Sequence, residues 1–507
     1  MFYMVQNKLT LTFFFSLFVL SISVAQEDYN ILDFGAIADA KTLNTTAIQA
    51  TIDAANKNGG GRVLVPEGRF LSGTILMKSN VELHVEKGGV LLGSTRPEHY
   101  LKLNRWKAFV MADNQENIAI TGQGEIDGQG RKLALHLDSL FYAGIIDSLH
   151  YNFVEMRPKY YLRPQLIEFV NCKNIEVKNI TLKNAACWVQ THDKSENIVI
   201  DSVTTISDAY WNNDGIDISD CKNVRITNCF VNAADDGICL KSHKEGYLCE
   251  DVYIENCTVR SSASAVKFGT RSHGGFKNVV IKNIKVYDTF RSAIAIESVD
   301  GGILEDVLVE NIEATNTGNA IFIRLGKRNK KGEVGTLKNV TLKNIKVDVA
   351  YERPDYAYEV RGPALPFFHN TFPSSIVGIP GYKVENVTLE NIEINYPGKG
   401  NDGLAYRPIS DLDRVPENIN HYPEFSMFRE LPAWGFYVRH VDGLTMKNIK
   451  LNCAEPDYRP PMVFDDVQNL NISALGIEGE KKEKHYILYK TERVNIENAQ
   501  AVLKLKP

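Results

Sequence analysis

One short motif recurs along the chain and constrains its fold more than any other feature. It reads Asn or Asp, then an aliphatic residue, then any residue, then Val, Ile or Leu. Copies begin at Asn117, Asn174, Asn197, Asn223, Asp251, Asn278, Asp306, Asn339, Asn386 and Asn469. Between residues 174 and 306, successive copies are 23, 26, 28, 27 and 28 residues apart. Repeats of this length indicate a solenoid, because a propeller blade needs about 40 residues.

The alternation of aliphatic and variable positions inside each copy predicts short β-strands. The sequence lacks the Leu pattern of leucine-rich repeats, so we expect an all-β fold, a right-handed single-stranded parallel β-helix. Asn tolerates the left-handed backbone of tight turns. We therefore expect the repeated Asn at one corner of the coil, hydrogen-bonded to the Asn of the next coil. Because stacked coils share one core, a long chain of this kind can remain a single domain.

Two regions depart from the repeat. Residues 27–115 include an amphipathic stretch, Thr45 to Lys57, which predicts a helix that caps the open end of the solenoid. Residues 350–440 lengthen the interval between copies and carry clusters of Pro, Tyr and Phe. We interpret them as long loops beside a groove; the alternative is surface decoration. Residues 26–507 are predicted to form a single catalytic β-helix domain, and we expect a monomer.

The N-terminal segment Met1–Ala25 has the features of a secretory signal peptide. Lys8 is its only charge, Leu9–Val24 is apolar, and small residues precede Gln26. The segment is short for a membrane span, which needs about 20 apolar residues. No later stretch is apolar enough to span a bilayer. We expect cleavage after Ala25 and an exported protein, periplasmic or secreted.

The composition excludes several classes of protein. The chain has 57 Lys and Arg against 62 Asp and Glu, a net charge of −5. This mild acidity argues against nucleic acid as a partner, since such proteins usually carry a basic excess. Seven of the eight Cys lie between residues 172 and 257, without the paired spacing of a zinc site. They are expected to form disulfides or to act as small apolar core residues.

Carboxylates cluster on two adjacent repeats. Asp214 precedes Gly215-Ile216, and Asp235-Asp236 precedes Gly237-Ile238. The offset from Asp214 to Asp236 is 22 residues, about one coil, so the three carboxylates should meet on one patch. Clustered like charges are unfavourable and shift pKa values apart. Glycoside hydrolysis needs such a pair, with one carboxyl group protonated and another ionised.

The residues around this cluster resemble family 28 of the glycoside hydrolases, the polygalacturonase-like pectin hydrolases. The similarity covers most of the chain to about residue 350 and rests also on Asp33-Phe34-Gly35-Ala36, Gly59-Gly60-Gly61-Arg62-Val63, Gly122-Gln123-Gly124-Glu125-Ile126-Asp127-Gly128 and Arg163-Pro164. The resemblance implies that Asp235 is the general acid and that Asp214 and Asp236 hold and activate the attacking water. It also implies inversion at the anomeric carbon, no metal or other cofactor, and a galacturonic-acid-containing pectic substrate.

The sequence departs from the family at its cationic positions. The family's Gly-His-Gly becomes Ala263-Ser264-Ala265, and its Arg-Ile-Lys becomes Ala295-Ile296-Glu297. Alignment of the coils stacks Lys267 with Asp217, Cys239 and Ala295, and stacks Arg291 with Asn213, Asp235 and Ala263. We hypothesise that Lys267 and Arg291 form a relocated anion-binding pair. The alternative is that Lys267 only pairs with Asp217.

Asn212, Lys241 and His243 are further candidates for substrate binding, because they flank the carboxylates. The long loops favour action from a chain end or on a branched substrate. Three alternative functions stay open. The first is rhamnogalacturonan hydrolysis, consistent with the missing cations. The others are a Ca²⁺-dependent pectate lyase and a non-catalytic carbohydrate-binding solenoid.

Overall fold

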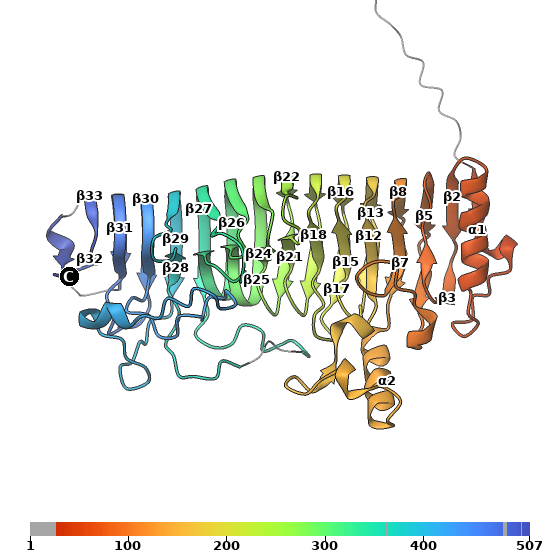
Figure 1. The fold of residues 1–507 in the computed structure, drawn as a ribbon, viewed down its shortest axis with the longest axis horizontal. Helices are drawn as coiled ribbons and strands as arrows, with labels where there is room; N and C mark the ends of the chain where they lie inside the picture. The colour runs from red at the N-terminus through yellow and green to blue at the C-terminus, as the bar shows by residue number, and fades with distance from the viewer. Residues whose placement is uncertain (1–26, 361, 363, 480–483, 498, 507) are drawn as a thin grey trace, which may run out of the picture.

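A computed structural model describes residues 27–506, except 361, 363, 480–483 and 498. The chain forms a right-handed parallel β-helix whose coils stack along one long axis (Figure 1), which confirms the predicted fold class. The predicted signal peptide, Met1–Ala25, lies outside the described residues. Within them, no helix is long and apolar enough to cross a membrane.

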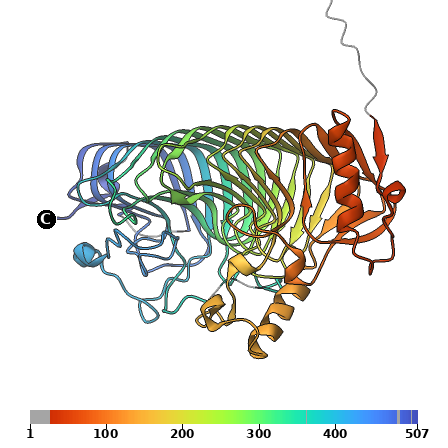
Figure 2. The ribbon, with the colours of Figure 1, turned by 45° about the vertical axis from the view of Figure 1, so that its right-hand side comes forward.

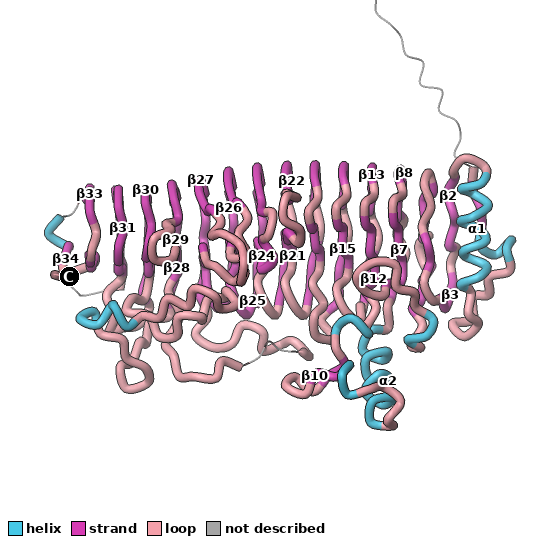
Figure 3. The backbone as a smooth tube through the Cα atoms, in the orientation of Figure 1, coloured by secondary structure: helices cyan, strands magenta, loops and turns pink. Residues whose placement is uncertain are grey.

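Strands of successive coils lie side by side along the solenoid (Figure 3), and their pairings define three parallel sheets. Sheet one holds the repeated motif: β1 (Asp28–Asn30), β2 (Gly61–Val65), β5 (Val81–Val85), β8 (Glu116–Thr121), β13 (Lys173–Lys178), β16 (Glu196–Asp201), β19 (Lys222–Thr227) and β22 (Cys249–Glu255). Sheet two holds β3 (Gly68–Ser72), β6 (Gly89–Gly93), β9 (Glu125–Asp127), β14 (Thr181–Lys183), β17 (Thr204–Ser207), β20 (Phe230–Ala233) and β23 (Thr258–Ser261).

Sheet three holds β4 (Ile75–Leu76), β7 (Ala108–Asp113), β12 (Gln165–Val170), β15 (Gln190–Asp193), β18 (Ile216–Ser219), β21 (Ile238–Ser242) and β24 (Val266–Ser272). Later strands bend around the coil and enter more than one sheet: β25 (Gly275–Ser298), β26 (Ile303–Leu325), β27 (Thr336–Val349), β29 (Val384–Tyr396), β30 (Phe436–Cys453) and β31 (Met462–Glu478). The remaining strands in the stack are β28 (Ser374–Val377), β32 (Tyr486–Tyr489), β33 (Glu492–Ile496) and β34 (Val502–Lys504).

The repeated Asn residues form the predicted ladder at one corner. Asn117, Asn174, Asn197 and Asn223 have φ values of 54°, 54°, 57° and 56°, in the left-handed region. The side-chain amide of Asn174 donates to Asn117 at 2.8 Å, and Asn197 donates to Asn174 at 2.9 Å. Each Asn therefore both makes the turn and links its coil to the one before.

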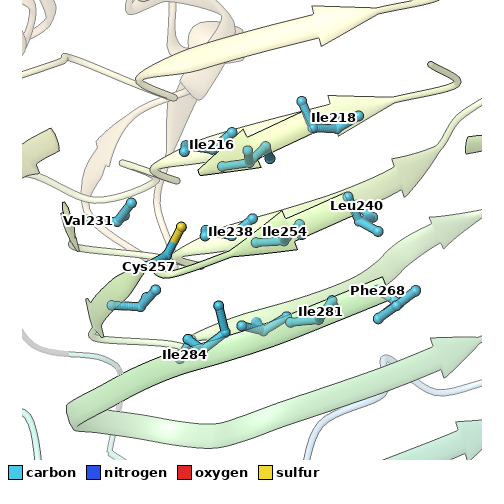
Figure 4. Packing of buried hydrophobic residues seen from close by; sticks show 14 of the residues in the cluster. Ile216, Ile218, Val231, Ile238, Leu240, Ile254, Cys257, Phe268, Ile281 and Ile284 are labelled. Atoms are coloured by element: carbon cyan, nitrogen blue, oxygen red, sulfur yellow. The ribbon is translucent and has the colours of Figure 1, made fainter. Parts of the chain in front are cut away.

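The core consists of aliphatic side chains stacked in register from coil to coil (Figure 4). Ile218, Leu240 and Phe268 occupy the same position on β18, β21 and β24, and none of them is exposed. Burial of each such side chain stabilises the fold by about 1.5–3 kcal/mol. All eight Cys are buried with free thiols, so they act here as small core residues.

Helix α1 (Thr45–Lys57) covers the N-terminal end of the solenoid, at the residues predicted from the sequence (Figure 2). It buries Ile48, Ile52 and Ala55 against the first coil. Because that coil has no neighbour before it, the helix shields strand edges and apolar surface that would otherwise face water. The stacked strands begin with β1 and β2, within the part of the sequence that we had assigned to the cap.

A second helix, α2 (Gly130–Tyr142), was not predicted. With the hairpin of β10 (Tyr151–Asn152) and β11 (Arg157–Pro158), it projects from the same side of the solenoid as the long loops (Figure 1). Those loops, between β27 and β30, pack their own apolar cluster against sheet three: Phe372, Leu412, Phe425 and Phe428 contact Phe322, Val377 and Tyr437. The segment is therefore built onto the sheet that carries the carboxylates.

Candidate active site

The three carboxylates lie immediately before strands of sheet three, on adjacent coils. The backbone N–H of Gly215 donates to the carbonyl of Asp236 at 2.9 Å, which sets Asp214 level with Asp236. Gly237 donates to Ser264 in the same way, at 2.9 Å. A Cβ atom on Gly237 would lie 2.6 Å from the carbonyl oxygen of Ala265. The Asp-Gly-Ile motif thus needs Gly because the next coil passes too close for any side chain.

Asp214, Asp235 and Asp236 line a cavity of about 530 Å³. Aromatic rings form much of its wall: Trp106, Tyr160, Trp188 and Tyr422. The Trp106 and Trp188 rings meet edge to face, with centroids 4.3 Å apart. The cavity therefore combines acidic groups with apolar ring surfaces of the kind on which a sugar can stack.

Lys241 joins two of the buried carboxylates. Its ammonium group lies 2.8 Å from Oδ2 of Asp214 and also contacts Asp217, above the ring of Trp188. Burial raises the pKa of Asp217 to about 6 and raises that of Asp214, while Lys241 opposes both shifts. Oδ1 of Asp214 accepts no hydrogen bond from the described residues. Asp217 is a fourth carboxylate that the sequence reasoning did not assign to the site.

Lys267 has the coil register that the sequence predicted, level with Asp217, Cys239 and Ala295. Its side chain is only 1% exposed, and its ammonium group lies 3.1 Å from Oδ2 of Asp236. The alternative expectation, a pair with Asp217, is wrong, because Lys267 pairs with Asp236 and the cation on Asp217 is Lys241. Lys267 also contacts the Tyr422 hydroxyl at 3.4 Å.

Arg291 lies next to Ala263, to whose carbonyl its backbone N–H donates at 2.9 Å. Its guanidinium group is 3.5 Å from the carboxylate of Glu424, in the long loops. Arg291 and Lys267 are thus both engaged with carboxylates of the protein, and neither lines the cavity.

The adjacent carboxyl groups of Asp235 and Asp236 have opposite pKa shifts. Burial and the charge of Asp236 raise the pKa of Asp235, although Arg291 and Lys267 work against this. Burial alone would raise the pKa of Asp236 too, but Lys267, with Lys241 and Arg291, outweighs it and holds the pKa below its ordinary value. At a pH between the two pKa values, Asp235 therefore keeps its proton while Asp236 is ionised, which are the states that a proton donor and a proton acceptor need.

Asn212 and His243 also line the cavity. The amide of Asn212 donates to Oδ2 of Asp235 at 3.3 Å and accepts from Arg163 at 2.7 Å. His243 Nε2 lies 2.9 Å from Arg105. Burial, together with the charge of Arg105, lowers the pKa of His243 to about 2, which keeps its imidazole neutral.

Ser264 and Glu297 stand at positions where the sequence departs from the family motifs, and both lie near residues of the carboxylate cluster. The backbone N–H of Ser264 donates to Oδ1 of Asp236 at 3.2 Å. Glu297 is buried beside Lys267, and burial raises its pKa to about 8. Neither side chain lines the cavity.

The sequence reasoning missed several residues of the cavity: Arg105, Trp106, Tyr160, Trp188, Thr270, Arg271, Arg328 and Tyr422. Except for Thr270 and Arg271, they come from segments between the strands of the coils, whose lengths follow no repeat. Thr270 and Arg271 differ from the others because they lie within β24, and their place next to Lys267 in the sequence could have signalled them.

Residues 57–356 match the sequence profile of Glycosyl hydrolases family 28. The chain is 25% identical over 394 residues to a probable polygalacturonase of Vitis vinifera, covering 74% of this chain and 71% of that protein. It is 23% identical over 434 residues to an exo-poly-alpha-D-galacturonosidase of Dickeya chrysanthemi, covering 72% of this chain and 71% of that protein.

Solved structures give the same relationship. A hyperthermoactive exopolygalacturonase from Thermotoga maritima superposes with a TM-score of 0.58 at 26% identity, covering 73% of this chain and 87% of that one. The family 28 exopolygalacturonase of Yersinia enterocolitica shares the fold with a TM-score of 0.61 at 20% identity, covering 93% and 78% of the two chains. The profile covers more than half of the chain and includes all three carboxylates, so this protein belongs to family 28 of the glycosyl hydrolases.

Proposed function

We propose that this protein is an exported, inverting glycosidase that releases galacturonic acid units from the end of a pectic chain. The opposite pKa shifts of Asp235 and Asp236 in one cavity carry the proposal, because they supply an acid and a base side by side. The names of the relatives, polygalacturonase and exopolygalacturonase, favour this substrate and this mode of action.

In the proposed reaction, Asp235 donates its proton to the glycosidic oxygen as the bond from that oxygen to the anomeric carbon breaks. A water molecule attacks the anomeric carbon from the opposite face and forms the new C–O bond. Asp236 takes the proton that this water loses. Attack from the opposite face inverts the configuration, and exchange with solvent returns both carboxyl groups to their starting states.

Asp214 is assigned to orient the attacking water. Lys241 holds one of its oxygens at 2.8 Å, while Oδ1 has no partner among the described residues. Lys267 engages Asp236 on the other side. A Ca²⁺ site here would need these carboxylates as ligands, and the two ammonium groups already neutralise them. This favours hydrolysis over a Ca²⁺-dependent lyase.

Action from a chain end is supported by the walls of the cavity. Tyr160, on the segment that follows α2, and Tyr422, in the long loops, both line it. An open groove would let a polysaccharide pass through in both directions. Walls from two insertions instead favour a substrate that enters by its end.

Asp235→Asn is the direct test. We expect hydrolysis of oligogalacturonides to fall by at least about 10²-fold, with the thermal unfolding midpoint unchanged within a few degrees. Asp402→Asn, at an exposed position in the long loops, is the matched control and should keep full activity. An active Asp235→Asn variant would refute the assignment of the acid.

Product analysis separates this proposal from its alternatives. Release of single galacturonic acid units with inverted configuration supports exo-acting polygalacturonase activity. Cleavage only of rhamnose-containing pectin would support the rhamnogalacturonan hydrolase, and an unsaturated product would support a lyase. Binding of pectic chains without any turnover would support the non-catalytic solenoid.

We further propose that residues 26–507 form one domain, because a single buried cluster extends from Tyr29 to Ala501, and that the protein is a monomer. N-terminal sequencing of the exported protein should begin at Gln26. Light scattering should give the mass of one chain, and a larger mass would contradict the monomer.

A further inference from the structure

A second hollow, of about 690 Å³, adjoins the catalytic cavity beyond the end of β26. Two segments line it, residues 327–330 and residues 416–421. Arg328 lines both hollows, so they meet at this side chain. A chain that extends out of the catalytic cavity past Arg328 would enter the second hollow.

The charge of the second hollow is positive. It is lined by Lys327, Arg328 and Lys330, and by one acidic residue, Glu417. The Glu417 carboxylate is already engaged by Arg439, at 2.6 Å. Lys327 and Lys330 make no ion pair with any described residue, so their charges are available to an anion.

The wall opposite these lysines is firmly held. Arg324, which is fully buried, donates to the carbonyl oxygens of Glu417 at 2.7 Å and Asn418 at 3.2 Å. The backbone N–H of Lys327 donates to the carbonyl of Ile419 at 2.8 Å. The two segments are thus tied to each other and to β26, and the hollow is part of the folded structure.

Arg328 is oriented for a further contact. Its Nε and Nη2 atoms donate to the two oxygens of buried Asp300, at 2.9 Å and 2.6 Å. This bidentate pair fixes the guanidinium plane and leaves Nη1 without a described partner. Nη1 can therefore donate to a ligand at the junction of the two hollows.

We propose that this second hollow is a carboxylate-binding subsite, which takes the acid group of a uronic acid unit next to the sugars in the catalytic cavity. The inference rests on the proposed function for the identity of the ligand. It accounts for how an acidic substrate is recognised although Lys267 and Arg291 are engaged with Asp236 and Glu424. Lys327, Lys330 and Nη1 of Arg328 supply the cations instead.

The double variant Lys327→Gln, Lys330→Gln tests the subsite. With trigalacturonic acid, we expect KM to rise about tenfold, since each partly exposed ion pair contributes modestly, while kcat stays unchanged. The methyl-esterified trimer should give the same KM with wild type and variant, because it carries no charge to bind. The matched control, Lys285→Gln with Lys331→Gln, removes two charges at exposed positions outside the hollow and should behave as wild type.

Calorimetry in the Asp235→Asn background measures binding independently of turnover. In this background, the two lysine substitutions should raise the Kd for trigalacturonic acid about tenfold. The Kd for the methyl-esterified trimer should not change. Equal Kd and KM values with and without the two lysines would overturn the subsite. A wild type that binds trigalacturonic acid through these lysines yet hydrolyses no pectic substrate would overturn the proposed function and leave the subsite standing.

Discussion

The regular coils and the long loops between β27 and β30 contribute to the same cavity in different ways. The coils place Asp214, Asp235 and Asp236 by repetition, one turn apart, with backbone hydrogen bonds from each coil to the next. The loops contribute Tyr422 and Glu424, which contact Lys267 and Arg291 from outside the repeat. The carboxylates are therefore part of the repeat, whereas a wall of the cavity and a share of the charge balance come from outside it.

The largest effect is expected from breaking a buried contact within the coils. Lys267→Met leaves Asp236 buried without its nearest cation, which should cost about 3–5 kcal/mol in the free energy of unfolding. Because Lys267 favours ionised Asp236, the proposed base, its loss should raise the pKa of that carboxyl group. The acidic limb of the kcat/KM profile should therefore move to higher pH.

Chemical denaturation and a pH series check this prediction. Lys343→Met provides the control, since Lys343 lies 3.8 Å from Glu310 with its side chain 38% exposed and should contribute less than about 1 kcal/mol. An acidic limb that stays in place would show that Lys267 does not set the ionisation of Asp236.

A smaller effect on stability is expected from adding a methyl group to a glycine, and it should differ between a coil and a loop. Gly237→Ala places Cβ 2.4 Å from a methyl group of Val259 and 2.6 Å from a backbone oxygen. We expect a loss of about 1–3 kcal/mol from overpacking. Gly403→Ala, in the long loops, meets only the side-chain oxygen of Asn401, at 3.1 Å, and should change stability by less than about 0.5 kcal/mol. Similar unfolding midpoints for the two variants would contradict the difference between the regions.

The Arg291–Glu424 contact joins the two regions. Removing the charge of Arg291 and removing that of Glu424 should move the pH profile of activity in opposite directions. Arg291 lowers the pKa of Asp235, so Arg291→Gln should raise that pKa and move the alkaline limb to higher pH. Glu424→Gln leaves the charge of Arg291 uncompensated and should move the limb to lower pH. We expect shifts of about half a unit to one unit, each unit corresponding to about 1.4 kcal/mol. Shifts in the same direction would rule out this coupling.

The smallest effect is expected at the hydroxyl group of Tyr422. It contacts Lys267 at 3.4 Å, so Tyr422→Phe removes one weak polar contact but keeps the ring in the cavity wall. We expect kcat/KM to fall less than about fivefold, corresponding to about 1 kcal/mol. Tyr422→Ala removes the wall itself and should increase the share of products longer than one sugar. An unchanged product distribution would show that this ring does not restrict the substrate.

The repeat made much of the site predictable. Once the spacing of the Asn motif is aligned, Asp214 falls level with Asp236, and Lys267 falls level with Asp217 and Ala295. Parallel strands in adjacent coils hold this register through their hydrogen bonds, so position in the sequence converts directly into position on a sheet. Helix α1 was predictable for a similar reason, since its apolar spacing is local.

The sequence alone therefore determined the solenoid, its Asn ladder, the capping helix and the patch on which the carboxylates meet. The contacts of Lys241 with Asp214 and Asp217, and of Lys267 with Asp236, became visible only in the folded protein. Register sets the level of a side chain but not the direction of a long, flexible one, which follows the nearest buried charge. Contacts such as Lys267 with Tyr422 join segments 155 residues apart, and no periodicity relates them. They depend on how the loops fold back over the coils.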